Sequence, residues 1–365
     1  MTFSSRFLSL FLMAILLPAM AADAAFHVYA PTHATRKLHI FKADMVDGQL
    51  TLTAEKEVDL GFQCFSIAAH PEKPILYVAG DGAEKGQPPA GAVVYLNADG
   101  SYERHVPVVF DHPYAYVSLD RKNRFLLGVD YGGGQVDVYP LGADGVPGQR
   151  VAALDEGVST AHCVWTSPDN RFVYIPYVND SNTIFQYAFD AETGGLKPLE
   201  PKNAHPPDKS GPRHIAYHPK LPIIYFSNEK HLGVSAYDMQ KDGQLKLRQM
   251  CDAVGADQSK DGVSSSDILI TPDGRFIFAG IRGHSQDLNR ISRYRVEPNG
   301  ELTLLGLTPA DKIPWGLTLS PDGQYLLVSA WEGETLTAYA ITQDGDLAKT
   351  ASVALPKLVM DLVTK

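Results

Sequence analysis

The sequence has 365 residues, with 42 acidic and 32 basic side chains that give a formal net charge of −10. This acidic balance, without a segment dense in Lys or Arg, disfavours a nucleic acid or an anionic membrane surface as a partner. At this length two domains would be usual, but a uniform repeat along the chain favours one closed ring over residues 25–365.

The first 24 residues have the pattern of a cleaved signal peptide. Arg6 precedes an apolar run over residues 7–17, and an Ala-rich patch then offers cleavage after Ala21 or Ala24. No later segment approaches the roughly 20 apolar residues that a membrane helix needs. We therefore expect export, to the periplasm in a Gram-negative source and otherwise by secretion, with an uncleaved anchor as the alternative.

A β-hairpin pattern recurs through the rest of the chain. In its clearest copy, residues 211–219 alternate polar and apolar side chains, a Pro-containing turn follows, and residues 223–229 form a second strand-like run. Equivalent positions lie 47 to 53 residues apart and are Tyr77, Leu127, Tyr174, Tyr225, Phe278 and Leu327. A period near 50 with several strands per unit is typical of a β-propeller, an all-β fold.

The two ends of the chain complement each other. From Phe26 the repeat begins without its first strand, whereas residues 356–363 form an orphan strand without a hairpin partner. Joining the two makes one composite blade, and with six internal copies this predicts a seven-bladed ring closed by the N- and C-terminal strands. Closure removes the free sheet edges that invite aggregation.

Candidate functional residues gather at one mouth of the predicted channel. Innermost strands start, and their partner strands end, at this mouth. The strand-start position holds Phe65, Ala115, His162, Arg213, Ser266 and Trp315. The position after the second strand holds His33, Asp81, Tyr131, Val178, Glu229, Arg282 and Trp331. Two Arg, one Glu and one His suit a chemical site, although Arg213 and Glu229 could instead form an ion pair that pins the blade entrances.

Other sites find no support in the sequence. No His pair has metalloprotease spacing, no Gly-rich phosphate loop occurs, and no Ser lies in a nucleophile elbow. We therefore predict no metal and no cofactor.

The chain from about Phe26 to Val363 resembles the seven-bladed propeller lactonases, the family of propeller-type 6-phosphogluconolactonase and carboxy-muconate lactonizing enzyme. The motifs that carry the resemblance are residues 211–214 with 218–219, 228–229, 266–268 with 271–274, and His162 with 167–170. The resemblance implies a metal-independent site made of His162, Arg213, Glu229 and Arg282. Gly280 and Ile281 before Arg282, and an insert over residues 253–263 that could cover the mouth, depart from the family pattern.

From these residues we predict hydrolysis of an aldono-1,5-lactone, with glucono-1,5-lactone as the favoured substrate because export separates the protein from sugar phosphates. Glu229 would activate water, Arg213 and Arg282 would stabilise the oxyanion, and His162 would protonate the ring oxygen. The residues expected to bind or orient the substrate are His214, Asn228, Asp267, Ser266, Trp315, Trp331 and His33.

Three alternatives remain open from the sequence. A 6-phosphogluconolactonase would need a cation for the phosphate, for which Lys230 is the nearby candidate. A muconate-type cycloisomerase would transfer a proton without water, and an exported propeller could bind a ligand without catalysis. The oligomeric state, a monomer or a weak dimer, is equally open.

Overall fold

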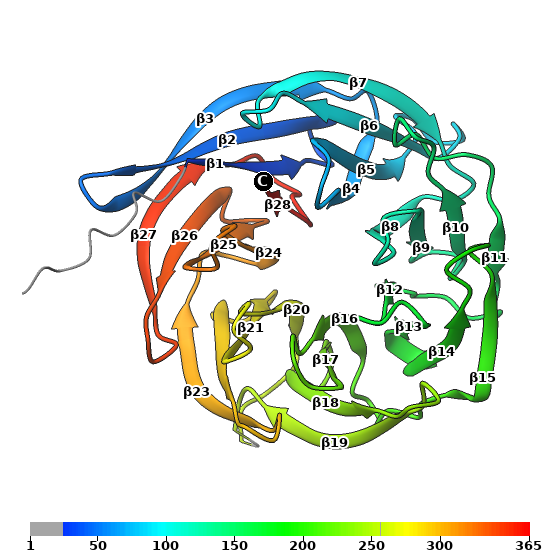
Figure 1. The fold of residues 1–365 in the computed structure, drawn as a ribbon. Helices are drawn as coiled ribbons and strands as arrows, with labels where there is room; N and C mark the ends of the chain where they lie inside the picture. The colour runs from blue at the N-terminus through cyan, green and yellow to red at the C-terminus, as the bar shows by residue number, and fades with distance from the viewer. Residues whose placement is uncertain (1–24, 256) are drawn as a thin grey trace, which may run out of the picture.

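The structure, a computed structural model, describes residues 25–255 and 257–365, so the predicted signal peptide lies outside the described residues. Within them, seven four-stranded sheets stand around a central channel like the blades of a propeller (Figure 1). The chain colours run once around the ring, so each blade lies next to the blades that precede and follow it in sequence. The predicted seven-bladed β-propeller is confirmed.

Every blade has the same order from the channel outward. The innermost strands are β4 (Gln63–Ala69), β8 (Tyr114–Leu119), β12 (Trp165–Thr166), β16 (Pro212–Tyr217), β20 (Val263–Ile270), β24 (Pro314–Leu319) and β28 (Val363–Thr364). The second strands are β1 (Phe26–Pro31), β5 (Ile75–Asp81), β9 (Phe125–Asp130), β13 (Phe172–Tyr177), β17 (Ile223–Asn228), β21 (Phe276–Gly283) and β25 (Tyr325–Ala330). The third strands are β2 (Lys37–Val46), β6 (Ala90–Leu96), β10 (Val136–Pro140), β14 (Thr183–Phe189), β18 (Gly233–Met239), β22 (Arg290–Val296) and β26 (Thr335–Ile341). The outermost strands are β3 (Gln49–Asp59), β7 (Tyr102–Val109), β11 (Ala152–Leu154), β15 (Leu196–Asn203), β19 (Leu245–Asp252), β23 (Leu302–Pro309) and β27 (Leu347–Ala354). A 3₁₀ turn, η1 (Asn179–Ser181), follows β13.

The composite blade closes the ring as predicted, in the order β28-β1-β2-β3. Its innermost strand is shorter than the expected run over residues 356–363, because β28 pairs with β1 through Tyr29 opposite Val363 and Val28 opposite Thr364. Before β28 the backbone leaves the strand conformation at Leu358, whose φ is +66°. Met360 and Asp361 of this segment lie at the channel mouth, just before the chain joins the sheet.

The core lies between neighbouring blades, where apolar faces of adjacent sheets meet. Tyr225 and Val234 of one blade, for example, pack with Ile277 and Tyr294 of the next. This arrangement explains why the second and third strands read as nearly continuous β-branched and aromatic runs, since both of their faces are covered.

A β-bulge recurs near the start of most innermost strands. The register shifts between Cys64 and Ser66, Tyr114 and Tyr116, Pro212 and Ile215, Ser265 and Ile268, and Pro314 and Leu317. A bulge re-aims side chains, and these fall on the strand-start positions of the repeat. The bulges therefore direct side chains from consecutive blades toward one channel mouth.

Candidate active site

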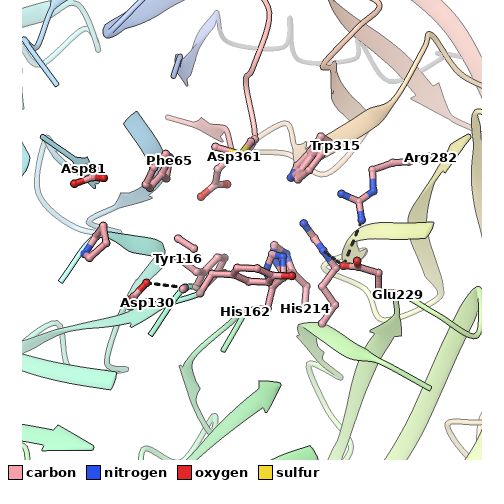
Figure 2. Close-up of a pocket in the computed structure, with 16 residues that line it drawn as sticks. Phe65, Asp81, Tyr116, Asp130, His162, His214, Glu229, Arg282, Trp315 and Asp361 are labelled. Atoms are coloured by element: carbon pink, nitrogen blue, oxygen red, sulfur yellow. Dashed lines mark hydrogen bonds and ion pairs between the residues drawn. The ribbon is translucent and has the colours of Figure 1, made fainter. Parts of the chain in front are cut away.

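A cavity of about 480 Å³ occupies this channel mouth (Figure 2). Its walls combine aromatic and ionisable side chains from all seven blades. The lining residues are Phe65, Asp81, Pro113, Ala115, Tyr116, Asp130, Tyr131, Gly132, His162, Arg213, His214, Glu229, Arg282, Trp315, Met360 and Asp361. A cavity of this size suits one small metabolite.

Two arginines converge on one carboxylate at one side of the cavity. Arg213, from the bulge of β16, donates its Nε to Glu229 Oε2 at 3.1 Å. Arg282, from β21, places Nη2 3.3 Å from the same oxygen and also donates to the Ser265 carbonyl at 2.7 Å. The ion pair considered from the sequence therefore exists, but it lies in the wall of the cavity and includes a second arginine.

Two guanidinium nitrogens of Arg213 lack a hydrogen-bond partner among the described residues. Its side chain is fully buried, and neither Nη1 nor Nη2 has a hydrogen-bond partner within the described part of the chain. Buried polar groups are almost always paired, so two unpaired guanidinium nitrogens at a cavity wall indicate a polar ligand.

Arg282 is influenced by its neighbours in the wall. Burial, with the charge of Arg213 second, lowers the pKa of Arg282 to about 9. The guanidinium carbon of Arg282 also lies 4.1 Å from the ring centroid of Trp315.

A chain of hydrogen bonds runs from a buried carboxyl to the cavity. Asp267, in the bulge of β20, lies 2.7 Å from His214 Nδ1. His214 Nε2 in turn lies 3.2 Å from His162 Nδ1. Backbone contacts hold both ends, because His162 N donates to the Pro176 carbonyl and Leu317 N donates to the second oxygen of Asp267.

The protonation pattern of this chain follows from its contacts. Burial acts to raise the pKa of Asp267, but the facing imidazole of His214 holds it below its ordinary value. Burial and the charge of Arg213 hold the pKa of His162 well below 6.5 and also lower that of His214. A carboxylate at Asp267 therefore fixes the proton of neutral His214 on Nδ1, and His214 Nε2 accepts from His162 Nδ1. The remaining nitrogen of His162, Nε2, then carries a free lone pair.

The residues singled out from the sequence fall into three groups. Six of them line the cavity: His162, Arg213, Glu229, Arg282, His214 and Trp315. Three others lie directly behind the lining, namely Asp267 behind His214, Trp331 against Trp315, and His33 stacked on Phe65. Asn228 accepts a hydrogen bond from Ser235, and Ser266 donates to the Pro314 carbonyl, so these two hold strands together without lining the cavity.

Asp361, Asp130 and Tyr116 line the cavity but were not predicted from the sequence. Asp361 precedes β28, and the edge of the Tyr116 ring contacts His214 with 5.1 Å between ring centroids. A signal for Asp361 was present, because residues 360–362 align with Ser266, Asp267 and Ile268 once the orphan strand is treated as a repeat copy.

Three further findings bear on earlier expectations about the insert, a metal site and a membrane helix. In the insert over residues 253–263, Lys260 donates to the His231 carbonyl, and none of the described residues of the insert lines the cavity. Among residues 25–255 and 257–365, no group of three or more His, Cys, Asp or Glu side chains could hold a metal ion. In the same ranges, no helix is long and apolar enough to cross a membrane.

Known proteins resemble this chain along nearly its whole length. The model of the family described as "Lactonase, 7-bladed beta-propeller" matches residues 27–360. A 6-phosphogluconolactonase of Cronobacter sakazakii is 29% identical over 90% of this chain and 95% of its own, and one of Pectobacterium carotovorum is 30% identical over the same shares. The solved structure of a periplasmic gluconolactonase of Pseudomonas aeruginosa superposes with a TM-score of 0.82 at 21% identity, covering 93% of this chain and 99% of that one.

Proposed function

The chain belongs to the seven-bladed β-propeller lactonases and is a lactone hydrolase, and from that premise we propose that it hydrolyses unphosphorylated aldono-1,5-lactones such as glucono-1,5-lactone. The observation that carries the proposal is the convergence of Arg213, Arg282, Glu229 and His162 on one cavity. Arg213 offers two unpaired, buried N–H-bearing nitrogens there, which match the carbonyl oxygen of a lactone.

The arginines stabilise the charge that develops during attack. A tetrahedral intermediate carries its negative charge on the former carbonyl oxygen, and preorganised donors in a water-poor site stabilise that charge strongly. Glu229 contacts both guanidinium groups through Oε2 and so holds them in register. In this proposal Glu229 is therefore a positioning residue, in place of the base expected from the sequence.

His162 carries out both proton transfers in this proposal. Its free Nε2 takes a proton from a water molecule, and the resulting hydroxide adds to the lactone carbonyl carbon. Collapse of the intermediate breaks the bond to the ring oxygen, which takes the proton back from His162. The product is an open hydroxy acid that ionises in solution. His214 and Asp267 keep His162 in the required tautomer through their hydrogen bonds.

Two observations favour an unphosphorylated substrate outside the cytoplasm. Residues 1–24 have the pattern of an export signal, and a structural neighbour of the same fold is a periplasmic gluconolactonase. We therefore place this protein in the periplasm, where oxidation of free sugars supplies unphosphorylated lactones.

The second candidate function is 6-phosphogluconolactonase activity. It is favoured by the names of relatives that are 29 and 30% identical to this chain. Lys230, the cation considered for the phosphate, is exposed and lies outside the cavity lining, 3.9 Å from Glu229 Oε1.

The test is proton release from fresh glucono-1,5-lactone in weak buffer with EDTA, using the purified mature protein. The parent should exceed the spontaneous rate, and Arg213→Ala should lose on the order of a hundredfold in turnover. Arg248→Ala is the matched control, because it removes an arginine paired with Asp238 on outer strands, far from the cavity lining. No acceleration by the parent would refute the proposal and favour the second candidate, 6-phosphogluconolactonase activity, ahead of a muconate-type cycloisomerase or a non-catalytic binding propeller.

A further inference from the structure

Three carboxyl groups line the side of the cavity that faces away from Glu229. Asp81 ends β5, Asp130 ends β9, and Asp361 precedes β28. Figure 2 shows Asp81 and Asp130 on the side opposite Arg282, with Asp361 between them and Trp315. We call Asp81, Asp130 and Asp361 the acidic wall.

The three carboxyls differ in how much of their hydrogen-bonding capacity is used. Asp130 accepts from the backbone N–H groups of Gly132 and Gly133, one on each oxygen. Asp81 accepts from Gly82 N on Oδ1, which leaves Oδ2 for a ligand. Asp361 makes more hydrogen bonds than the other two, and the residue is partly exposed and lines the cavity.

Asp361 is held in place by neutral donors. Its Oδ2 accepts from Ser66 Oγ at 2.7 Å and Ile67 N at 3.0 Å, and Oδ1 accepts from Leu362 N at 2.9 Å. Burial, followed by the charge of Asp267, raises its pKa to about 7, because these hydrogen bonds only partly offset the loss of water.

Cations are confined to the other side of the cavity. Among the described lining residues, the permanently charged cations are Arg213 and Arg282, and both already contact Glu229. The unpaired Nη1 and Nη2 of Arg213 are an independent sign that a polar ligand enters from that side. The acidic wall therefore faces the arginines across the cavity, on the side where the ring and hydroxymethyl group of a lactone would lie if its carbonyl oxygen were bound by the arginines.

We infer that the acidic wall is the specificity determinant of this site: Asp81 and Asp361 accept hydrogen bonds from the hydroxyl groups of a neutral polyhydroxylated lactone, and the wall presents no cation to a phosphorylated one. The inference rests on the proposed lactonase function. A sugar hydroxyl donates readily to a carboxylate. A phosphate monoester carries a charge of about −1.5 to −2 at neutral pH and finds carboxyls in place of a cation.

The experiment measures kcat/KM for glucono-1,5-lactone and for enzymatically generated 6-phosphoglucono-1,5-lactone. The variants are Asp361→Asn and Asp81→Asn, and the control is Glu103→Gln, which removes one negative charge from an exposed position on β7. The parent should prefer the neutral lactone. Each cavity variant should reduce that preference about tenfold, mainly through KM, whereas the control should leave it unchanged.

Asp81→Asn keeps the test decisive if Asp361→Asn folds poorly, since Asp81 has fewer contacts. A parent that prefers the phosphorylated lactone would overturn the inference and leave the protein a lactonase. Parallel losses on both substrates would also overturn it, because they indicate a purely structural role. A parent inactive on both lactones would instead refute the proposed function on which the inference rests.

Discussion

Asp267 in the blade of β20–β23 and Asp361 in the composite blade occupy equivalent positions of the repeat, and their backbone contacts match. Each carboxyl accepts from the N–H of the next residue, at 2.8 Å from Ile268 and 2.9 Å from Leu362. Each also accepts from the innermost strand of the following blade, at 3.1 Å from Leu317 and 3.0 Å from Ile67. Both carboxyls thus fasten one blade to the next.

The blade that precedes each carboxyl makes the difference. Before Asp267, the equivalent residue is His214, whose Nδ1 lies 2.7 Å from the carboxyl. Before Asp361, it is Gly316, which has no side chain to donate. The same repeat position therefore holds an ionised anchor of a histidine relay in one blade and a carboxyl with a pKa of about 7 in the other. Chemistry in a propeller arises from pairs of blades, which is how a repeat of similar units builds an asymmetric site.

The largest effect on activity is expected for Asp267→Asn, which removes the carboxylate that anchors the histidine relay. An amide has one acceptor oxygen, whereas His214, Ile268 and Leu317 all donate to Asp267. Without the carboxylate, His214 no longer keeps His162 in the tautomer with a free Nε2. The variant should therefore lower kcat on glucono-1,5-lactone about a hundredfold or more, with a much smaller change in KM. Thermal unfolding of the variant checks that it is folded, and a kcat within threefold of the parent would remove the relay from the mechanism.

A second prediction concerns how stability depends on pH. The native pKa of Asp361, about 7, is raised above its ordinary value of 3.8, so the fold favours the neutral acid. This contribution to stability is complete below the ordinary value and is lost as pH rises through about 7. The difference in Tm between the parent and Asp361→Asn should therefore shift by a few degrees in favour of the variant from pH 5 to pH 8. A constant difference in calorimetric scans would contradict the assigned pKa.

A third prediction concerns Gly316, the residue that stands beside Asp361 where His214 stands beside Asp267. A Cβ at Gly316 would lie 3.0 Å from Asp361 Cα and 3.1 Å from the Met360 carbonyl oxygen. Gly316→Ala must therefore displace the segment that carries Asp361, at a cost of about 1–3 kcal/mol in the free energy of unfolding. Gly148→Ala is the control, because its nearest contacts are ordinary ones at 3.4 and 3.5 Å. Equal urea midpoints for the two variants would show that this close approach is unimportant.

The smallest expected effect is on the acid side of the pH–rate profile. The pKa of His162 lies well below 6.5 because of burial and the charge of Arg213, so its Nε2 remains free at mildly acidic pH. The profile is measured on Asp361→Asn, because this variant removes the carboxyl whose pKa of about 7 lies in the same range. We expect its kcat/KM to change less than about twofold between pH 6 and 8, after subtraction of the spontaneous rate. An acid limb centred near 6.5 in stopped-flow proton release would indicate an unperturbed imidazole as the base.

The sequence predicted the ring, its closure and the mouth that holds the cavity, because the repeat spacing and the orphan strand are visible as patterns. It also placed His162, Arg213 and Trp315 at strand starts that line the cavity. It could not show which side chains the bulges turn inward. Ser266 and Asn228 were expected to meet the substrate, but Ser266, in the bulge of β20, donates to the Pro314 carbonyl, and Asn228 accepts a hydrogen bond from Ser235 of the neighbouring strand.

The late position of Asp361 in the chain has a consequence for the order of assembly. Its side chain bonds Ser66, 295 residues earlier, and the strand that closes the ring follows immediately. A nascent chain can form local hairpins early, but it has neither the closing strand nor this part of the acidic wall until residue 361 has been made. Contacts at such sequence separation form slowly. A chain that ends before residue 361 therefore lacks both the closing strand and part of the acidic wall, so it has no complete binding site.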